Sequence, residues 1–232
     1  MPEPYDIAPE VNAPDLPGRV VVRPAGEDVY DAAASELFSL SIDCVRALGD
    51  FHLALSVSPG LEGLYQRLMV DPKFRALPWE RTHLWLACEQ GDGDVCGREL
   101  RELIIEHAGI PGEQAHLIAD ADDYQGALRE TLAWREPGHD RLDGVVLALD
   151  DPILTGGADP PDADLVVRLG DGLIRLSGRA INASRWIGVL GLGAGARERL
   201  GEAGAGSPIE LAPVGGRLCW YLDHAACVGD ES

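Results

Sequence analysis

The sequence predicts an α/β fold with a Rossmann-like, mostly parallel sheet that has helices on both faces. Short apolar runs alternate along the chain with amphipathic stretches whose apolar residues recur every three or four positions. Residues 142–149 form a run that is apolar on both faces, as a strand buried between two helix layers requires. The 232 residues, 46% of them hydrophobic, suffice to bury a sizeable core.

Each element follows from its local pattern. Short runs rich in Val, Ile and Leu predict strands at residues 18–23, 51–55, 82–87, 142–149, 185–190 and 217–222. Helical spacing predicts helices at residues 29–48, 61–68, 121–134 and 194–200, and one through residues 100–104 that stops at 109–111. Residues 165–169 and 173–177 flank a Gly-Asp-Gly turn and predict a small β-hairpin excursion, which follows a loop over 156–164.

The domain organisation is expected to be simple. Residues 1–17 are rich in proline and acids, which predicts an extended or disordered arm. Residues 18–232 are expected to form one α/β domain. No segment has the pattern of a signal peptide or of a membrane span, so we expect a cytoplasmic protein that does not bind membranes.

Charge and cysteine content narrow the function classes. The chain has 39 acidic against 19 basic residues, a net charge of -20, and a single lysine, Lys73. Such a negative field repels phosphate backbones, so nucleic-acid binding is not expected. The five cysteines form no CxxC pair, and Cys88, Cys96 and His83 match no zinc spacing, so we expect free thiols, no metal and no cofactor.

The order of several short motifs resembles the 6-phosphogluconolactonase family, within the larger group of glucosamine-6-phosphate deaminases and ribose-5-phosphate isomerases. The resemblance covers about residues 18–226. It rests on Ala-Leu-Ser at 54–56, Trp-Glu-Arg-Thr-His at 79–83, Ile-Pro at 110–111, Ile-Asn-Ala at 181–183 and Trp-Tyr-Leu-Asp-His-Ala-Ala at 220–226. It implies this family's fold and a place in sugar-phosphate metabolism, the pentose phosphate pathway, where the family hydrolyses a lactone.

The phosphate-binding motifs of the family are altered in this chain. Its Ser-Gly-Gly-Ser-Thr-Pro turn reads Ser-Val-Ser-Pro-Gly-Leu at 56–61, so an anion could still meet Ser56, Ser58 and the Gly60 amide, but the glycine nest is gone. Two basic positions are also lost. The arginine of Asp-Glu-Arg is replaced by Gln90, after Glu89, and the lysine of Gly-Ala-x-Lys by Ala196, with Arg197 one residue further.

The catalytic motif is altered as well. The family's Gly-x-Gly-x-Asp-Gly-His-Thr carries a histidine thought to activate water, and without gaps Leu154 takes its place here, followed by a matching Thr155. Leucine transfers no proton. Asp150 and Asp151 lie at the same strand end and are the candidate catalytic acids, although an acidic pair in a loop is usually solvated.

Three hypotheses follow. The preferred one is a catalytically degenerate 6-phosphogluconolactonase-like protein that acts through its surface, as a partner or structural subunit of a sugar-phosphate enzyme. An active lactonase or hydrolase with relocated acidic groups is the alternative. The third is an enzyme whose cleft takes a neutral or cationic small molecule, with Asp150, Asp151 and Glu89 as its acids.

Overall fold

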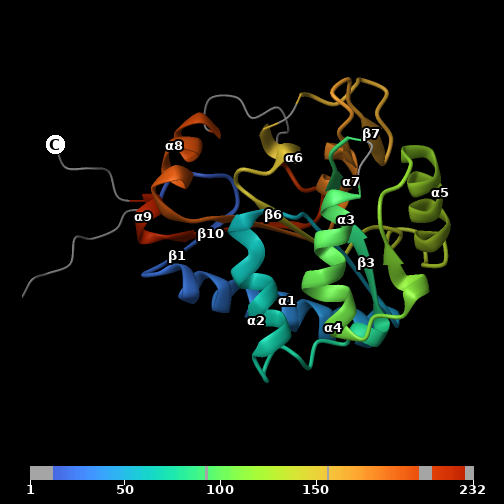
Figure 1. Ribbon diagram of the computed structural model, residues 1–232, viewed down its shortest axis with the longest axis horizontal. Coiled ribbons are helices and arrows are strands. Elements are labelled where there is room, and N and C mark those ends of the chain that lie inside the picture. Colours follow the sequence, from blue (N-terminus) through green and yellow to red (C-terminus); the bar gives the residue numbers. More distant parts are fainter. Residues whose placement is uncertain (1–12, 92–93, 156, 204–210, 228–232) are drawn as a thin grey trace, which may run out of the picture.

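A seven-stranded sheet forms the centre of the molecule (Figure 1). The computed structural model describes residues 13–91, 94–155, 157–203 and 211–227. All neighbouring strands of this sheet run parallel. In spatial order they are β1 (Arg19–Arg23), β10 (Arg217–Asp223), β9 (Trp186–Gly191), β6 (Gly144–Ala148), β2 (Phe51–Leu55), β3 (Thr82–Leu86) and β5 (Ala115–His116).

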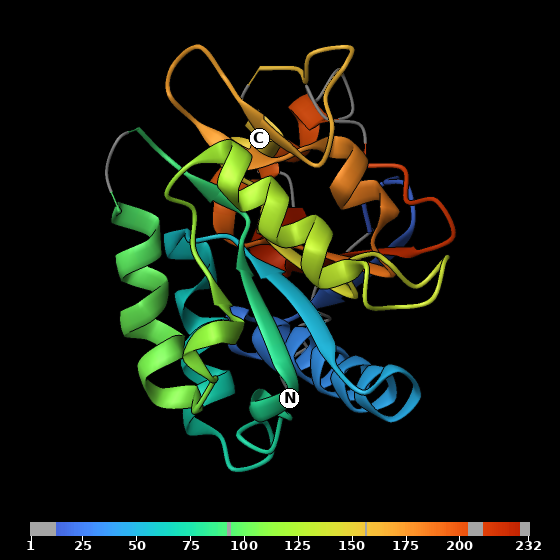
Figure 2. The same ribbon diagram turned by 90° about the vertical axis from the view of Figure 1, so that its right-hand side faces the viewer.

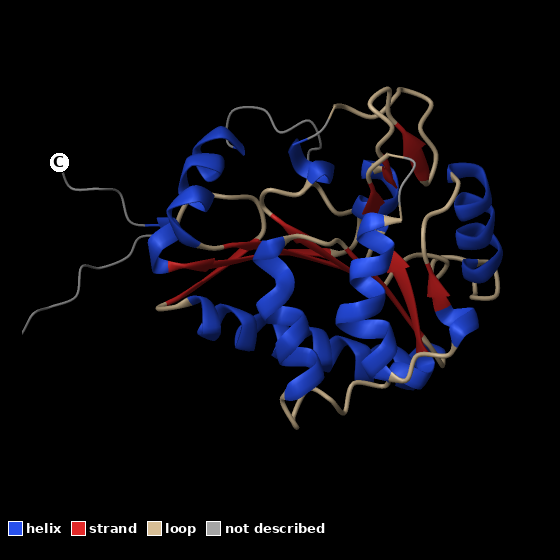
Figure 3. Ribbon diagram, in the orientation of Figure 1, coloured by secondary structure: helices blue, strands red, loops and turns tan. Residues whose placement is uncertain are grey.

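Helices cover both faces of the sheet, as Figures 1, 2 and 3 show. One face carries α1 (Gly26–Leu48), α2 (Glu62–Val70) and a continuous helix made of α3 (Val95–Leu100), a π-helical segment (Arg101–Ile105) and α4 (Glu106–Ala108). The other carries α5 (Ala121–Leu132), α6 (Pro152–Thr155), α7 (Gly178–Ala183) and α8 (Gly193–Ala203), and α9 (His224–Cys227) follows β10. Short 3₁₀ turns lie at Pro59–Leu61, Trp79–Arg81 and Gly112–Gln114.

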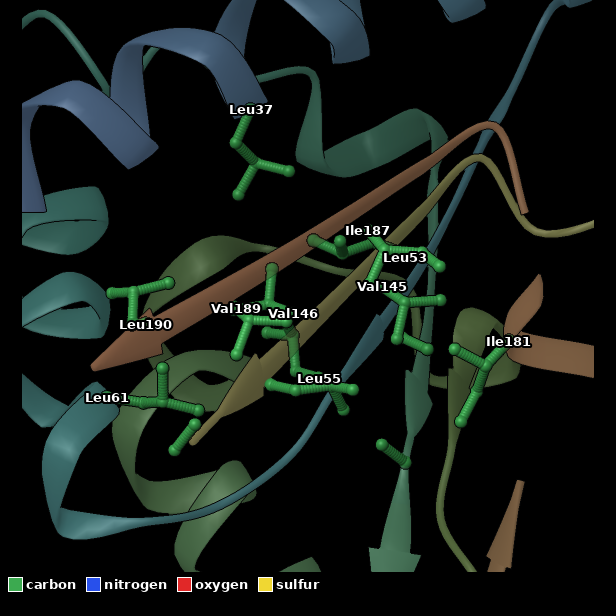
Figure 4. Packing of buried hydrophobic residues seen from close by; sticks show 14 of the residues in the cluster. Leu37, Leu53, Leu55, Leu61, Val145, Val146, Ile181, Ile187, Val189 and Leu190 are labelled. Atoms are coloured by element: carbon green, nitrogen blue, oxygen red, sulfur yellow. The ribbon is translucent and has the colours of Figure 1, made fainter. Parts of the chain in front are cut away.

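The core lies between the central strands and the helices. All five residues of β2 and of β6 are buried, as are all six of β9. Their branched side chains point to both faces of the sheet, and helix α1 contributes Leu37 to the cluster on one of them (Figure 4). A strand buried on both faces is what a parallel sheet between helix layers needs, so the predicted α/β fold is confirmed.

A second, antiparallel sheet stands apart from the first. The predicted hairpin forms it from β7 (Val166–Arg168) and β8 (Ile174–Leu176), and β4 (Cys88–Glu89) pairs with β8 on the other side. This small sheet places residues that follow β3 directly against the hairpin, with Cys88 opposite Arg175.

The N-terminal arm falls partly outside the described residues, which begin at residue 13. Leu16 packs against the core, and the Pro17 carbonyl accepts a hydrogen bond from Trp220 Nε1 at 2.7 Å. None of the helices among the described residues combines the length and the hydropathy that crossing a bilayer requires.

Candidate functional site

The carboxyl ends of β2, β3 and β6 meet at one edge of the sheet, beside the small antiparallel sheet. Ligands of open parallel sheets bind at this edge. Here we call it the carboxyl edge, and most of the predicted site residues lie on it: Ser56, Ser58, Gly60, Glu89, Gln90, Asp150, Asp151 and Thr155.

The turn after β2 is occupied by its own contacts. Ser58 caps the short 3₁₀ turn by accepting a hydrogen bond from the Gly60 amide at 3.4 Å. The same hydroxyl donates to Asp150 Oδ1 at 3.0 Å, so it joins the ends of β2 and β6. Ser56 is completely buried beneath them. Two of the three groups that could have met an anion therefore face an acid or the interior.

The two aspartates after β6 have different surroundings. Asp150 is exposed, whereas Asp151 is fully buried, so the expectation of a solvated acidic pair is wrong for Asp151. Its Oδ1 accepts from the Ile153 amide at 2.8 Å and lies 3.8 Å from the Cys88 thiol. Burial raises the pKa of Asp151 to about 6, and hydrogen bonding by Ser56 and by the Ile153 amide opposes the rise.

Glu89 holds the first turn of α3. Its side chain is buried, and three backbone amides donate to it: Gln90 at 3.0 Å, Cys96 at 3.1 Å and Gly97 at 2.8 Å. A carboxylate next to the first amides of a helix satisfies donors that would otherwise lack partners. Glu89 thus acts as a structural anchor, while the neighbouring Gln90 is exposed.

A buried arginine, Arg175 of β8, is the feature that sequence reasoning missed. Its Nη2 donates to the Gly157 carbonyl at 2.7 Å and pairs with Asp159 at 2.8 Å, and its side chain has no exposed surface. Burial lowers the pKa of Arg175, and Asp159, Cys88 and Asp151 act in the opposite direction. In the sequence Arg175 stands between the apolar Ile174 and Leu176, so alternation assigns it to the opposite face of the hairpin, and nothing in the pattern marked it as buried.

Several buried polar atoms of the carboxyl edge have no hydrogen-bond partner of normal geometry among the described residues. They are Ser56 Oγ, Asp151 Oδ2, Arg175 Nε and Arg175 Nη1. Buried polar groups are usually satisfied, so this concentration distinguishes the carboxyl edge from most of the described interior.

The remaining predicted residues lie at the margin. Thr155, on α6, is exposed, and its hydroxyl donates to the Asp151 carbonyl at 3.1 Å. Arg197 lies on α8, which follows β9, and is half-buried. Leu154 and Ala196 are both buried, with 7% exposure each. Among the described residues at or near the carboxyl edge, the acids Glu89, Asp150 and Asp151 outnumber the basic residues Arg175 and Arg197.

Comparison with known proteins agrees with the resemblance seen in the sequence. No family model matches the chain. It is 28% identical over 244 residues to the human GDH/6PGL endoplasmic bifunctional protein, a match that covers 88% of this chain. The corresponding protein of Oryctolagus cuniculus is 25% identical, again over 88% of this chain. The chain spans only 29% of the length of either relative.

Solved structures share the fold. A crystal structure of a devB protein superimposes with a TM-score of 0.73 at 20% identity, covering 90% of this chain and 97% of that one. The 6-phosphogluconolactonase from Thermotoga maritima gives a TM-score of 0.71 at 17% identity, with coverages of 88% and 99%. A monomeric glucosamine-6-phosphate deaminase gives 0.67 at 15% identity, with coverages of 90% and 98%.

Proposed function

We propose that this chain, which is similar to 6-phosphogluconolactonases in sequence and fold, is a catalytically degenerate relative that acts as a partner subunit of a sugar-phosphate enzyme. The observation that carries the proposal is that Leu154, which the ungapped reading of the motif aligns with the family's histidine, is a buried hydrocarbon side chain. A hydrocarbon side chain there neither accepts nor donates a proton. Loss of one positioned base typically costs 10²-fold to 10⁴-fold in rate.

The loss of phosphate-binding charge supports the same proposal. Gln90 and Ala196 stand where the family carries arginine and lysine, and Asp150 and Asp151 add negative charge beside them. Charged hydrogen bonds to a phosphate contribute about 1.5 to 3 kcal/mol each. The basic group buried at this edge, Arg175, is engaged by Asp159 and by the Gly157 carbonyl.

The proposed partner role draws on the relatives. Their name, GDH/6PGL bifunctional protein, describes a chain that has two activities, and the region similar to this chain makes up 29% of its length. A domain of this type that lacks its own chemistry still offers a surface to a second enzyme. We propose that this chain binds such an enzyme of sugar-phosphate metabolism.

The test is the hydrolysis of freshly generated 6-phosphogluconolactone. We expect the lactone to disappear at its spontaneous rate, with or without the protein. Acceleration of several orders of magnitude that is lost in Asp151→Asn would overturn the proposal. The matched control is Asp150→Asn, which removes a charge from the exposed neighbour.

One observation favours a second candidate, a hydrolase with a relocated acid. Asp151 has a pKa raised to about 6, close to that of working general acids and bases, and Arg175 of the facing hairpin has two donors without partners that could stabilise a developing oxyanion. Both side chains are buried, so this candidate requires the hairpin to open before a substrate can reach them. Such a site suits a neutral lactone better than a phosphorylated one. Turnover of glucono-1,5-lactone above the spontaneous rate, abolished in both Asp151→Asn and Arg175→Gln, would establish this candidate instead.

A further inference from the structure

Four aromatic rings gather on one face of the sheet where β2, β3 and β5 lie side by side. They belong to His52, His83, Trp85 and His116, which we call the histidine stack. The stack lies on the face covered by α5, since Tyr124 of that helix meets Trp85 edge-on at 5.7 Å. His52 and Trp85 are buried, and the other two rings are half-buried.

The four rings form two hydrogen-bonded pairs that stack on each other. Trp85 Nε1 donates to His52 Nδ1 at 3.2 Å, and His83 Nδ1 lies 3.1 Å from His116 Nε2. His52 stacks on His83 with ring centres 4.6 Å apart, and Trp85 stacks on His116 at 3.7 Å, both within 7° of parallel. Register sets this arrangement, because His52 pairs with His83 and Trp85 with His116 across adjacent strands.

The ring geometry argues against a metal ion. Asp50, His52 and His83 each offer a ligand atom, and these atoms lie within 4.8 Å of one another. An imidazole binds a metal in the plane of its ring, however, and two stacked, parallel rings cannot both direct a lone pair at one ion. The indole N–H also occupies His52 Nδ1, which leaves the proton on Nε2, facing Asp50 Oδ2 at 3.4 Å.

The contact between His83 and His116 depends on how many protons the pair holds. With both rings neutral, one N–H donates to the other ring's lone pair, and one outer nitrogen of the pair stays unprotonated. A first added proton can bind that outer nitrogen and leave the bridge intact. A second would place N–H against N–H across 3.1 Å, so the bridge must break.

We propose that the His83–His116 pair is a proton-sensitive latch that holds the edge strand β5 on β3 at neutral pH and releases it in acid. The strand is only two residues long, and its register pairs are Leu84 with Ala115 and Trp85 with His116. Besides this short register and the packing of Ala115 against the core, the ring of His116 attaches β5 to β3, because it bonds His83 and stacks on Trp85.

The surroundings place the release well below neutrality. Burial is the main cause that lowers the pKa of His83 and of His116 to about 4 each. For His83, the neighbouring His52 and Arg135 lower the pKa further, whereas Asp50 and Glu113 raise it. For His116, the neighbours His83 and His52 add to the lowering. Because both folded pKa values lie below the ordinary 6.5, the stabilisation is complete above about pH 6.5 and is lost as the pH falls through 4.

Hydrogen exchange of the full chain, corrected for the intrinsic pH dependence of exchange, tests the latch. We expect amides of the β5 segment to lose at least tenfold in protection between pH 7 and pH 4, while amides of β9 keep theirs. In His116→Gln the β5 protection should no longer depend on pH, whatever its level. The control, His107→Gln, replaces an exposed histidine of α4 and should behave like the unaltered chain.

The imidazole nitrogens provide a second readout that needs no variant. Nitrogen NMR of the histidine rings should show His83 and His116 joined by one N–H at pH 7 and protonating in two steps below pH 5. Protonation of either ring near pH 6.5, or loss of β5 and β9 protection together, would overturn the proposal.

Discussion

Arg135 connects the beginnings of two central strands. Its side chain is 5% exposed and binds two carboxylates: Nε donates to Asp50 Oδ1 at 2.9 Å, and Nη2 donates to Asp143 Oδ2 at 2.7 Å. Asp143, directly before β6, is fully buried and also accepts from Arg185 Nε at 2.9 Å. The guanidinium therefore holds the amino ends of β2 and β6 together, close to His83 of the histidine stack.

Replacing this arginine should destabilise the fold strongly. In Arg135→Met, Asp143 stays buried with one of its two cationic partners, and breaking a buried pair in this way costs about 3 to 5 kcal/mol. Urea denaturation measures the loss. The matched control, Arg129→Met, removes an exposed ion pair with Asp164 and should cost less than about 1 kcal/mol. Equal losses in the two variants would contradict the structural role of Arg135.

The buried carboxyl of Asp151 should make stability depend on pH in the reverse sense to the latch. Its folded pKa of about 6 exceeds the ordinary 3.8, so the folded chain holds the proton more tightly, and stability from this group falls as the pH rises from about 4 to 6. Asp151→Asn removes that fall. The stability of the variant relative to the unaltered chain should therefore rise over this range, by at most about 3 kcal/mol. Urea denaturation at several pH values measures it, and a difference that is constant with pH would refute the shift.

At the scale of elements, periodicity predicts the long units and misses the short ones. The helix that ends at Gly49 and the strand at residues 142–149 follow from apolar spacing, and both are present as α1 and β6. Strands β4 and β5 have two residues each, too few to show any alternation. Their pairing depends on partners far away in the sequence, which no local pattern contains.

The positions of the candidate site residues, likewise, could be predicted from the sequence only in part. Motif order placed Ser58, Asp150 and Glu89 at strand ends, where the structure has them. The burial of Asp151 and of Arg175 could not be predicted, because it results from the hairpin packing against residues that follow β3 and β6. Charged residues are rarely buried, so the sequence alone favours exposure for both.

Glu89 allows a test of how one element depends on one side chain. Glu89→Gln keeps the size but replaces one acceptor oxygen by a donor, so at least one of the amides of Cys96 and Gly97 loses its partner. We expect a loss of about 1 to 3 kcal/mol and faster hydrogen exchange in the first turn of α3. Glu102→Gln, at an exposed position of the same helix, should change neither. Unchanged exchange in Glu89→Gln would show that the carboxylate does not anchor this turn.

At the scale of the whole molecule, the chain has a net charge of -20, and some of its acidic residues lie at the carboxyl edge. Asp150 is exposed there, Asp151 and Glu89 are buried, and the lysine Lys73 lies elsewhere, where its Nζ contacts Ser35 and the ring of Phe74. If the proposed correspondence of motifs holds, a phosphorylated substrate at this edge meets Asp150, Glu89 and Gln90. Our proposal is therefore that the fold is retained while the local charge opposes a sugar phosphate.

Calorimetric titration with 6-phosphogluconate, the stable product of the lactonase reaction, tests this claim most directly, because it depends on the phosphate site and not on turnover. The 6-phosphogluconolactonase from Thermotoga maritima serves as the positive control. We predict no saturable heat at ligand concentrations up to about 1 mM, the range of binding free energies weaker than about −4 kcal/mol. A micromolar dissociation constant that is lost in Ser58→Ala would contradict the loss of the sugar-phosphate site.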